Sequence, residues 1–202
     1  PSPEFDVAQA VGLMVTKPVD AYFPAVGPTH MAQVAGGAFQ QGLTPLSMMA
    51  APSFNDAFVR EGFALAPLFN SGSMYLMAFV APYEAETAGH ATMRATFTAM
   101  GIDSANTFLV AGWASQHHLK GVLEAANKGG DLSRAGIRRA AGSVYVDSDG
   151  MMPTRELGQN RADAESFIAV PDGTIGSGVK LLAGNYVGPS AGGYDWESGP
   201  CS

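Results

Sequence analysis

The sequence predicts an α/β fold with a doubly wound parallel sheet, and three observations indicate it. Between residues 7 and 69, short apolar runs alternate with helical patterns, which is typical of a sheet covered by helices on both faces. The run Val19–Phe23 is too short for a helix and lies between two prolines, so it predicts a buried strand. A loop of small residues, Ala25–Pro28, follows and leads into a helical pattern. Because ligands bind at the carboxyl ends of such strands, this loop is the first candidate for a binding site.

The first block contains the elements that this pattern defines. Apolar residues at helical spacing predict a helix over Val7–Thr16, which ends before Pro18. A second helix is expected near Met31–Gln41 and ends at Gly42, because glycine readily adopts the left-handed conformation that follows many helices. The other predicted elements are strands at Pro45–Ala51 and Phe63–Phe69 and a short helix from Pro52 to Gly62.

The middle block is predicted to be almost wholly helical. One helix begins at Pro82 and runs to Met100, and a longer one spans Thr107–Lys128 before two glycines. Asp131 or Ser133 caps a third helix that ends at Ala141. Three helices without strands cannot close their own core well, so we expect them to cover a sheet supplied from elsewhere.

The last block returns to β structure. Val144–Val146 is a predicted strand, followed by a turn at 148–150. Glu165–Val170 is expected to pair with Val179–Ala183 around the turn at 171–173. The tail from Gly184 is expected to wrap the surface.

Composition sets the outer limits on function. The 202 residues are 47% hydrophobic, which is enough for a sizeable core. A net charge of −7 argues against nucleic acid or an anionic membrane as partner, because both require concentrated basic residues. The chain opens on Pro1, and we expect it to be a piece of a longer protein. Cys201 is the single cysteine, either paired with a cysteine outside the chain or a free thiol on a frayed tail.

Motifs for catalysis or metal binding are weak. His117 and His118 are adjacent on a helix and so face different directions, without the spacing or thiols of a zinc site. Ser115 lies in GWASQ, which does not match the G-x-S-x-G nucleophile elbow. Asp147 and Asp149 begin like a calcium loop, but the required later glutamate is absent, which favours a turn. We therefore predict no enzyme activity, no cofactor and no metal.

Several segments in a particular order resemble a known family. They are FDVAQAV, VDAYFPAVGP, QQGLTPLSMMA, EGF, LVAGWASQHHLKGVLEAANKGGDLSRAGIRRAA and ESFIAVPDGTI. Together they resemble the latter part of type I periplasmic binding proteins, in the branched-chain amino-acid (Leu/Ile/Val) branch of ABC-transporter solute receptors. The similarity covers nearly the whole chain but contains no short diagnostic motif. The family's first part, roughly as long again, has no counterpart here.

The resemblance implies two doubly wound, three-layer lobes joined by hinge crossovers, of which this chain holds an incomplete set. Residues 1–79 would belong to the second lobe, 80–142 would be helices of the first lobe, and 143–202 would return to the second lobe. Hinge candidates are Ala78–Pro82 and Gly142–Val144, which are short extended segments.

Three segments match the family's ligand loops, and the resemblance implies ligand contacts from Val26, Gly27, Pro28, Thr29, Ala51, Pro52, Ser53 and Trp113. The loop at 26–29 has the alternative of a plain strand-to-helix turn capped by Thr29. Trp113 would line the cleft beside Gly112 and Ser115, or else belong to the core of the first lobe. Amino-acid-binding relatives place an acidic residue at the second segment, and this chain has none there. Because a buried ammonium needs a counter-charge, the ligand prediction moves from amino acids toward carboxylates, aromatic compounds or other neutral compounds.

The function this implies is that of an extracytoplasmic solute-binding component of an ABC importer. Such a component would be periplasmic or extracellular, with a lipid anchor through a missing N-terminus as one possibility. Its partners would be a small solute, the membrane subunits of an ABC permease, and the missing N-terminal part of the same protein. The alternatives are a cytoplasmic ligand-sensing regulator with the same fold and a small α/β enzyme, the latter without converging titratable candidates.

Overall fold

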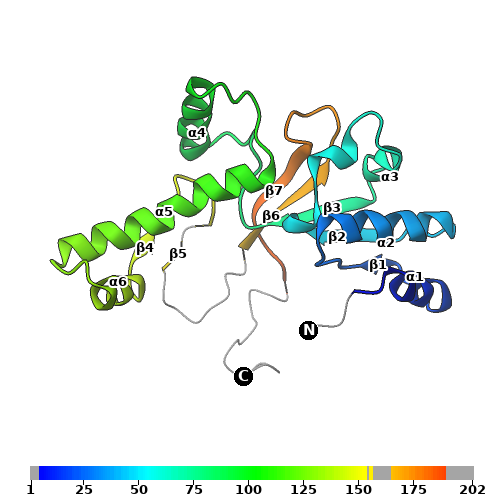
Figure 1. Ribbon diagram of the computed structural model, residues 1–202, viewed down its shortest axis with the longest axis horizontal. Helices are drawn as coiled ribbons and strands as arrows, with labels where there is room; N and C mark the ends of the chain where they lie inside the picture. Colours follow the sequence, from blue (N-terminus) through cyan, green and yellow to red (C-terminus); the bar gives the residue numbers. More distant parts are fainter. Residues whose placement is uncertain (1–4, 154, 157–164, 190–202) are drawn as a thin grey trace. The chain divides into compact units, whose positions relative to one another are not determined.

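The computed structural model describes residues 5–153, 155–156 and 165–189 of the chain. It shows a mixed α/β architecture that divides into two compact units (Figure 1). The first unit contains residues 1–78 and 168–182, and the second contains residues 79–167 and 183–202. The chain therefore passes between the units after Ala78, within the strand at 165–171 and within the strand at 179–187. The assignment of these units to the lobes of a clamshell stays a prediction.

The main sheet has five strands in the order β1-β2-β3-β6-β7. These strands are β1 (Ala21–Tyr22), β2 (Leu46–Ala50), β3 (Met74–Ala78), β6 (Glu165–Pro171) and β7 (Val179–Val187). β1 and β2 are parallel, with Ala21 opposite Leu46, and β2 and β3 are parallel, with Met49 opposite Leu76. The expected pairing of the last two strands is confirmed, because β6 and β7 are neighbours.

Helices connect the parallel strands of the first unit. α1 (Val7–Thr16) lies against α2 (Pro28–Gln40), and Val11 comes so close to Gly37 that a side chain there would meet it at 2.9 Å (Figure 1). α2 ends as predicted, with Gly42 at φ +74°. The core beneath contains buried Met31, Met49 and Leu76 and a group of phenylalanines around Phe69.

Two predictions for the first unit are wrong. The run Phe63–Phe69 is not a strand: its second half forms the short helix α3 (Ala66–Phe69), and the third strand is β3. Pro67 explains the difference, because it lacks the N–H that a central strand donates and it fits the first turn of a helix. The predicted helix from Pro52 to Gly62 is instead two 3₁₀ turns, at Ala51–Ser53 and Asp56–Val59.

The strand predicted at Val19–Phe23 is shorter and more exposed than expected. Only Ala21 and Tyr22 pair with β2, and the side chains of Val19 and Phe23 are 43% and 68% exposed. The reason is position, because β1 is the edge strand of the sheet in the described part of the chain. A short edge strand needs less apolar covering than a central one.

The second unit is dominated by three helices, α4 (Ala88–Ala99), α5 (Thr107–Lys128) and α6 (Arg134–Ala141). The bounds predicted for α5 are confirmed, and Ser133 caps α6 by accepting the Gly136 N–H. α4 begins six residues later than predicted from Pro82, because Thr87 is the residue that caps it. The unit also contains a small antiparallel sheet of β4 (Tyr145–Val146) and β5 (Arg155–Glu156).

Residues 143–167 group with these helices in the second unit. The predicted return of residues 143–202 to the second lobe stays a prediction. The expected tail beginning at Gly184 is still strand as far as Val187. Cys201 lies outside the described residues. Every helix that the structure describes is too short or too polar to cross a lipid bilayer.

Candidate functional site

The carboxyl ends of β1 and β2 bring two of the three predicted ligand loops together. The hydroxyl of Ser53, which is 1% exposed, accepts a hydrogen bond from the Val26 N–H at 3.2 Å and donates one to the Pro24 carbonyl at 3.2 Å. The Ala50 N–H donates to the same carbonyl at 3.2 Å. The two loops are therefore tied directly, as expected for neighbouring parallel strands that end at one sheet edge.

Ser53 thus has a structural role that the sequence did not predict. Its hydroxyl both donates and accepts within the protein, so it fixes the loop at 24–26. Ala51 is also buried, while Pro52 beside it is exposed. In the second predicted segment, Pro52 is therefore the residue whose side chain is accessible from outside, and Ser53 positions the neighbouring loop.

The start of α2 is the part of this edge best suited to bind a polar group. Gly27 precedes the helix without a side chain to cap it, and Pro28 has no N–H. The Met31 N–H donates to the Gly27 carbonyl at 3.0 Å, which closes the first turn of the helix. The N–H groups of Thr29 and His30 therefore come before any helical acceptor, at the positive end of the helix. Gly27 and Thr29 are exposed, and Val26 and Pro28 are half-buried.

The nearest acidic side chain in the following sequence is already paired. Asp56 forms an ion pair with Arg60 at 3.7 Å. The Arg60 guanidinium also donates to the Ile175 carbonyl at 3.1 Å and to the Gly176 carbonyl. Arg60 therefore holds the turn between β6 and β7, and Asp56 is the carboxylate that pairs with it. The second predicted segment, residues 51–53, contains no carboxylate of its own.

Trp113, the third predicted ligand contact, lies in the second unit on α5. It is half-buried and packs against a core that includes Met93 and Val110. Its ring meets Phe97 edge to face, with centroids 5.6 Å apart. Part of the indole thus serves the core, and part remains accessible.

The other residues considered for chemistry form no converging group. The Ser115 hydroxyl donates to the Ala111 carbonyl at 2.7 Å within its own helix. The Asp147 carboxylate accepts the Asp149 N–H at 2.8 Å, and Asp149 has φ +53°, which is a turn geometry. In the described residues, no three His, Cys, Asp or Glu side chains are placed to hold a metal ion.

A surface groove of about 760 Å³ lies between α1 and α2, away from these loops. Its lining is apolar along α1, with Val7, Val11 and Val15, and carries amides from α2. None of the eight predicted ligand residues lines it.

Comparison with known proteins identifies the fold. No protein-family model and no curated protein sequence matches the chain. Among solved structures, it is similar to a fatty acid ABC transporter substrate-binding protein from Thermomonospora curvata, with 20% identity and a TM-score of 0.81, over 95% of this chain and 49% of that one. It is also similar to a leucine-binding protein from Thermotoga maritima (12% identity, TM-score 0.62, 94% of this chain and 50% of that one). A third similar structure is a branched-chain amino acid ABC transporter protein from Thermus thermophilus with bound valine. It has 11% identity and a TM-score of 0.63, over 93% of this chain and 51% of that one.

The chain therefore has the fold of type I periplasmic binding proteins and spans about half the length of the structures it matches. At these identities the similarity shows the fold. The predicted resemblance to solute receptors of ABC transporters is confirmed at that level.

Proposed function

We propose that this chain is part of an extracytoplasmic solute-binding component of an ABC importer. Such a receptor traps a small organic molecule between two lobes and delivers it to a membrane permease. The observation that carries the proposal is the fold shared with the Thermomonospora curvata substrate-binding protein over 95% of this chain. Binding without chemistry also fits the sheet edge, where hydrogen-bond donors are present but catalytic side chains do not converge.

The solute class that fits best is a carboxylate with an apolar body. The N–H groups at the start of α2 favour an anion, and the exposed Thr29 adds a hydroxyl. An amino acid would bring an ammonium group to the same place. With Asp56 held by Arg60, no carboxylate of the second segment is available as its counter-charge. A fatty-acid-like carboxylate, as named for the relative with the TM-score of 0.81, meets these conditions.

The proposed ligand contacts are Val26, Gly27, Pro28, Thr29, Ala51, Pro52, Ser53 and Trp113. Pro28 and Val26 would supply apolar contact at the sheet edge, and the accessible part of the Trp113 ring would supply a flat apolar face. Ser53 would act through the loop that it positions. The rest of the cleft would come from the part of the protein that precedes this chain.

A thermal-shift screen of the full-length protein tests the solute class. Octanoate, benzoate and leucine are compared at equal concentrations. A cleft ligand at 100 times its dissociation constant adds about 2.7 kcal/mol to the free energy of unfolding. We expect octanoate or benzoate to raise the melting temperature and leucine to leave it unchanged. A shift with leucine alone would refute the solute class, and no shift with a broad set of small organic solutes would refute the receptor function.

A matched pair of variants tests the site. Thr29→Val removes the hydroxyl and keeps the shape of the side chain, so we expect the dissociation constant to rise about tenfold, as for the loss of a hydrogen bond to a charged group. Thr96→Val removes a hydroxyl that donates to the Thr92 carbonyl within α4 and should leave binding unchanged. Equal effects of the two variants would remove Thr29 from the site.

A further inference from the structure

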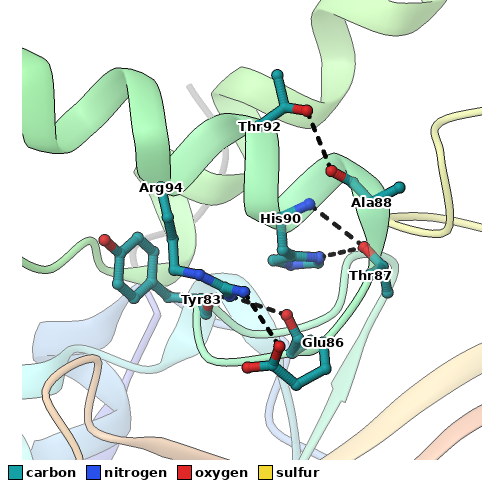
Figure 2. Close-up of polar contacts among 8 residues, drawn as sticks. Tyr83, Glu86, Thr87, Ala88, His90, Thr92 and Arg94 are labelled. Atoms are coloured by element: carbon teal, nitrogen blue, oxygen red, sulfur yellow. Dashed lines mark hydrogen bonds and ion pairs between the residues drawn. The ribbon is translucent and has the colours of Figure 1, made fainter.

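Two side chains on one face of α4 hold the segment that precedes it. His90 is completely buried. Its Nε2 lies 3.1 Å from the Ala81 carbonyl oxygen, and its Nδ1 lies 2.8 Å from the Thr87 hydroxyl oxygen. Figure 2 shows the imidazole directed toward Thr87, the residue that caps the helix.

Arg94, one helical turn further along, continues the same contact. Its Nη1 donates to the carbonyls of Tyr83 and Ala85, both at 2.9 Å, and its Nη2 lies 3.4 Å from Glu86 Oε2 (Figure 2). Backbone carbonyls at positions 81, 83 and 85 therefore all accept hydrogen bonds from α4. Residues 81–87 are fixed to the helix by side chains rather than by a regular backbone ladder.

The hydrogen bonds determine which tautomer the neutral ring of His90 adopts. A carbonyl oxygen only accepts, so Nε2 must carry the hydrogen that is donated to Ala81. Nδ1 is then the acceptor of the neutral ring and receives the Thr87 hydroxyl hydrogen. The same hydroxyl oxygen accepts the His90 N–H at 3.3 Å. A second ring hydrogen on Nδ1 would make the Thr87 hydroxyl an acceptor, so that its own hydrogen loses this partner, and would place a charge at a completely buried position.

This segment begins where the chain enters the second unit, between Ala78 and Phe79. The Ala81 N–H donates to the Met151 carbonyl at 3.0 Å, so Ala81 is held on both its N–H and its carbonyl sides. Ala81 is therefore fixed within the second unit three residues after the chain enters it.

We propose that His90 and Arg94 form an acid-sensitive latch that fixes residues 81–87 to α4 while His90 is neutral and releases this segment from the helix when His90 takes up a proton. The inference goes beyond the proposed function and does not depend on the identity of a solute.

The charges around His90 agree with the neutral form. Burial is the largest influence on the pKa of His90 and lowers it, and the Arg94 guanidinium also lowers it. The hydrogen bond to the Ala81 carbonyl and the carboxylates of Glu86 and Glu84 raise the pKa. The loop at 147–152, which packs on the start of α4, adds the carboxylates of Asp147 and Asp149, and both residues are exposed. The net direction is a pKa below the ordinary value, so protonation accompanies opening of the latch rather than preceding it.

Hydrogen exchange of the full-length protein tests the latch. Exchange is measured at pH 7.5 and 5.5 for peptides that cover residues 79–87. It is expressed as protection factors, because these correct for the intrinsic pH dependence of exchange. With an open-state pKa near 6.5, the opening equilibrium should increase by up to about tenfold over this range. His90→Gln keeps a donor for the Ala81 carbonyl but does not titrate, so its protection should be the same at both values. His30→Gln, which changes an exposed histidine of α2, should retain the change seen in the unmodified protein.

A second variant and a second measurement keep the test decisive if His90→Gln does not fold. Thr87→Val removes the hydroxyl that stabilises the neutral ring, so the loss of protection should begin at a higher pH than in the unmodified protein. Ring nitrogen chemical shifts should show Nδ1 unprotonated at pH 7.5. Unchanged protection in the unmodified protein, the same loss in His90→Gln, or a hydrogen on Nδ1 at pH 7.5 would each overturn the proposal.

Discussion

Replacing Gly89 with alanine should destabilise the second unit because the start of α4 has no room for a methyl group. A Cβ at this position would lie 2.5 Å from the Met151 Cγ and 2.8 Å from the Ser148 carbonyl oxygen. The Gly89 N–H donates to the Asp149 carbonyl at 3.0 Å, which holds the helix against this loop. Met151 is completely buried and Ser148 contributes a backbone atom, so neither can yield by a side-chain rotation into solvent.

The magnitude follows from two opposing terms. Overpacking a well-filled core costs typically 1–3 kcal/mol, and a clash with backbone belongs at the upper end of this range, about 2–3 kcal/mol. Alanine recovers up to about 1 kcal/mol because it is a better helix former than glycine. We therefore expect Gly89→Ala to lower the free energy of unfolding by about 1–2 kcal/mol.

Urea unfolding followed by circular dichroism measures this change, and Gly12→Ala is the matched control. Gly12 lies inside α1, and a Cβ there would have no heavy atom within 4 Å. The same substitution should therefore stabilise the protein by about 0.5–1 kcal/mol. If Gly89→Ala were as stable as the unmodified protein, or if both variants shifted in the same direction, the close approach of α4 to residues 148–151 would be refuted.

Three further predictions follow from the two cores and from His90. Phe69→Ala should cost about 3–5 kcal/mol in an unfolding titration, because this ring is completely buried and lies 4.7 Å from the Phe58 ring, whereas Phe23→Ala at a 68% exposed position should change stability by less than about 0.5 kcal/mol. Stability should decrease below pH 6.5, by at most about 1.4 kcal/mol per pH unit, since the pKa of His90 is lower in the folded than in the unfolded state; a flat profile from pH 7.5 to 5.5 would contradict this. Trp113→Ala should weaken solute binding more than it lowers the stability of the unliganded protein. Calorimetry can measure both free energies, and a larger effect on stability than on binding would assign the indole to the core beside Phe97.

The sequence predicts those elements of the fold whose ends carry strong local signals. α5 begins and ends at its predicted residues because Asn106 caps one end and two glycines follow the other. The strands β6 and β7 lie on either side of a turn that contains Asp172. The Asp172 carboxylate stabilises this turn by accepting hydrogen bonds from the Thr174 N–H and hydroxyl. These signals act within a few residues and need no knowledge of the rest of the chain.

Elements whose character depends on distant neighbours were predicted less well. Phe63–Phe69 is apolar because it packs around Phe58, with rings 5.2 Å apart between Phe58 and Phe63, and not because it is a strand. The start of α4 was placed too early because Arg94 draws the carbonyls of residues 83 and 85 into a turn, which spacing along the sequence does not reveal. The contact between Val26 and Ser53 follows from the parallel strands that precede the two loops, whereas the hydrogen bond from the Ser53 hydroxyl to the Pro24 carbonyl depends on a neighbour distant in the sequence. The role of these loops in ligand binding stays a prediction.

The exposed surface of α5 carries an apolar stripe. Phe108, Leu119 and Leu123 are 50%, 54% and 39% exposed, and at 100° per residue they lie within about 60° of one another around the helix axis. The buried residues Val110 and Ala114 lie on another side, against Met93 and Phe97. A helix that is apolar on two sides is stable in water when both are covered. Because the chain spans about half of the structures that share its fold, we propose that this stripe packs on a sheet that the present chain does not supply, which would make the second unit part of the first lobe of the proposed solute receptor.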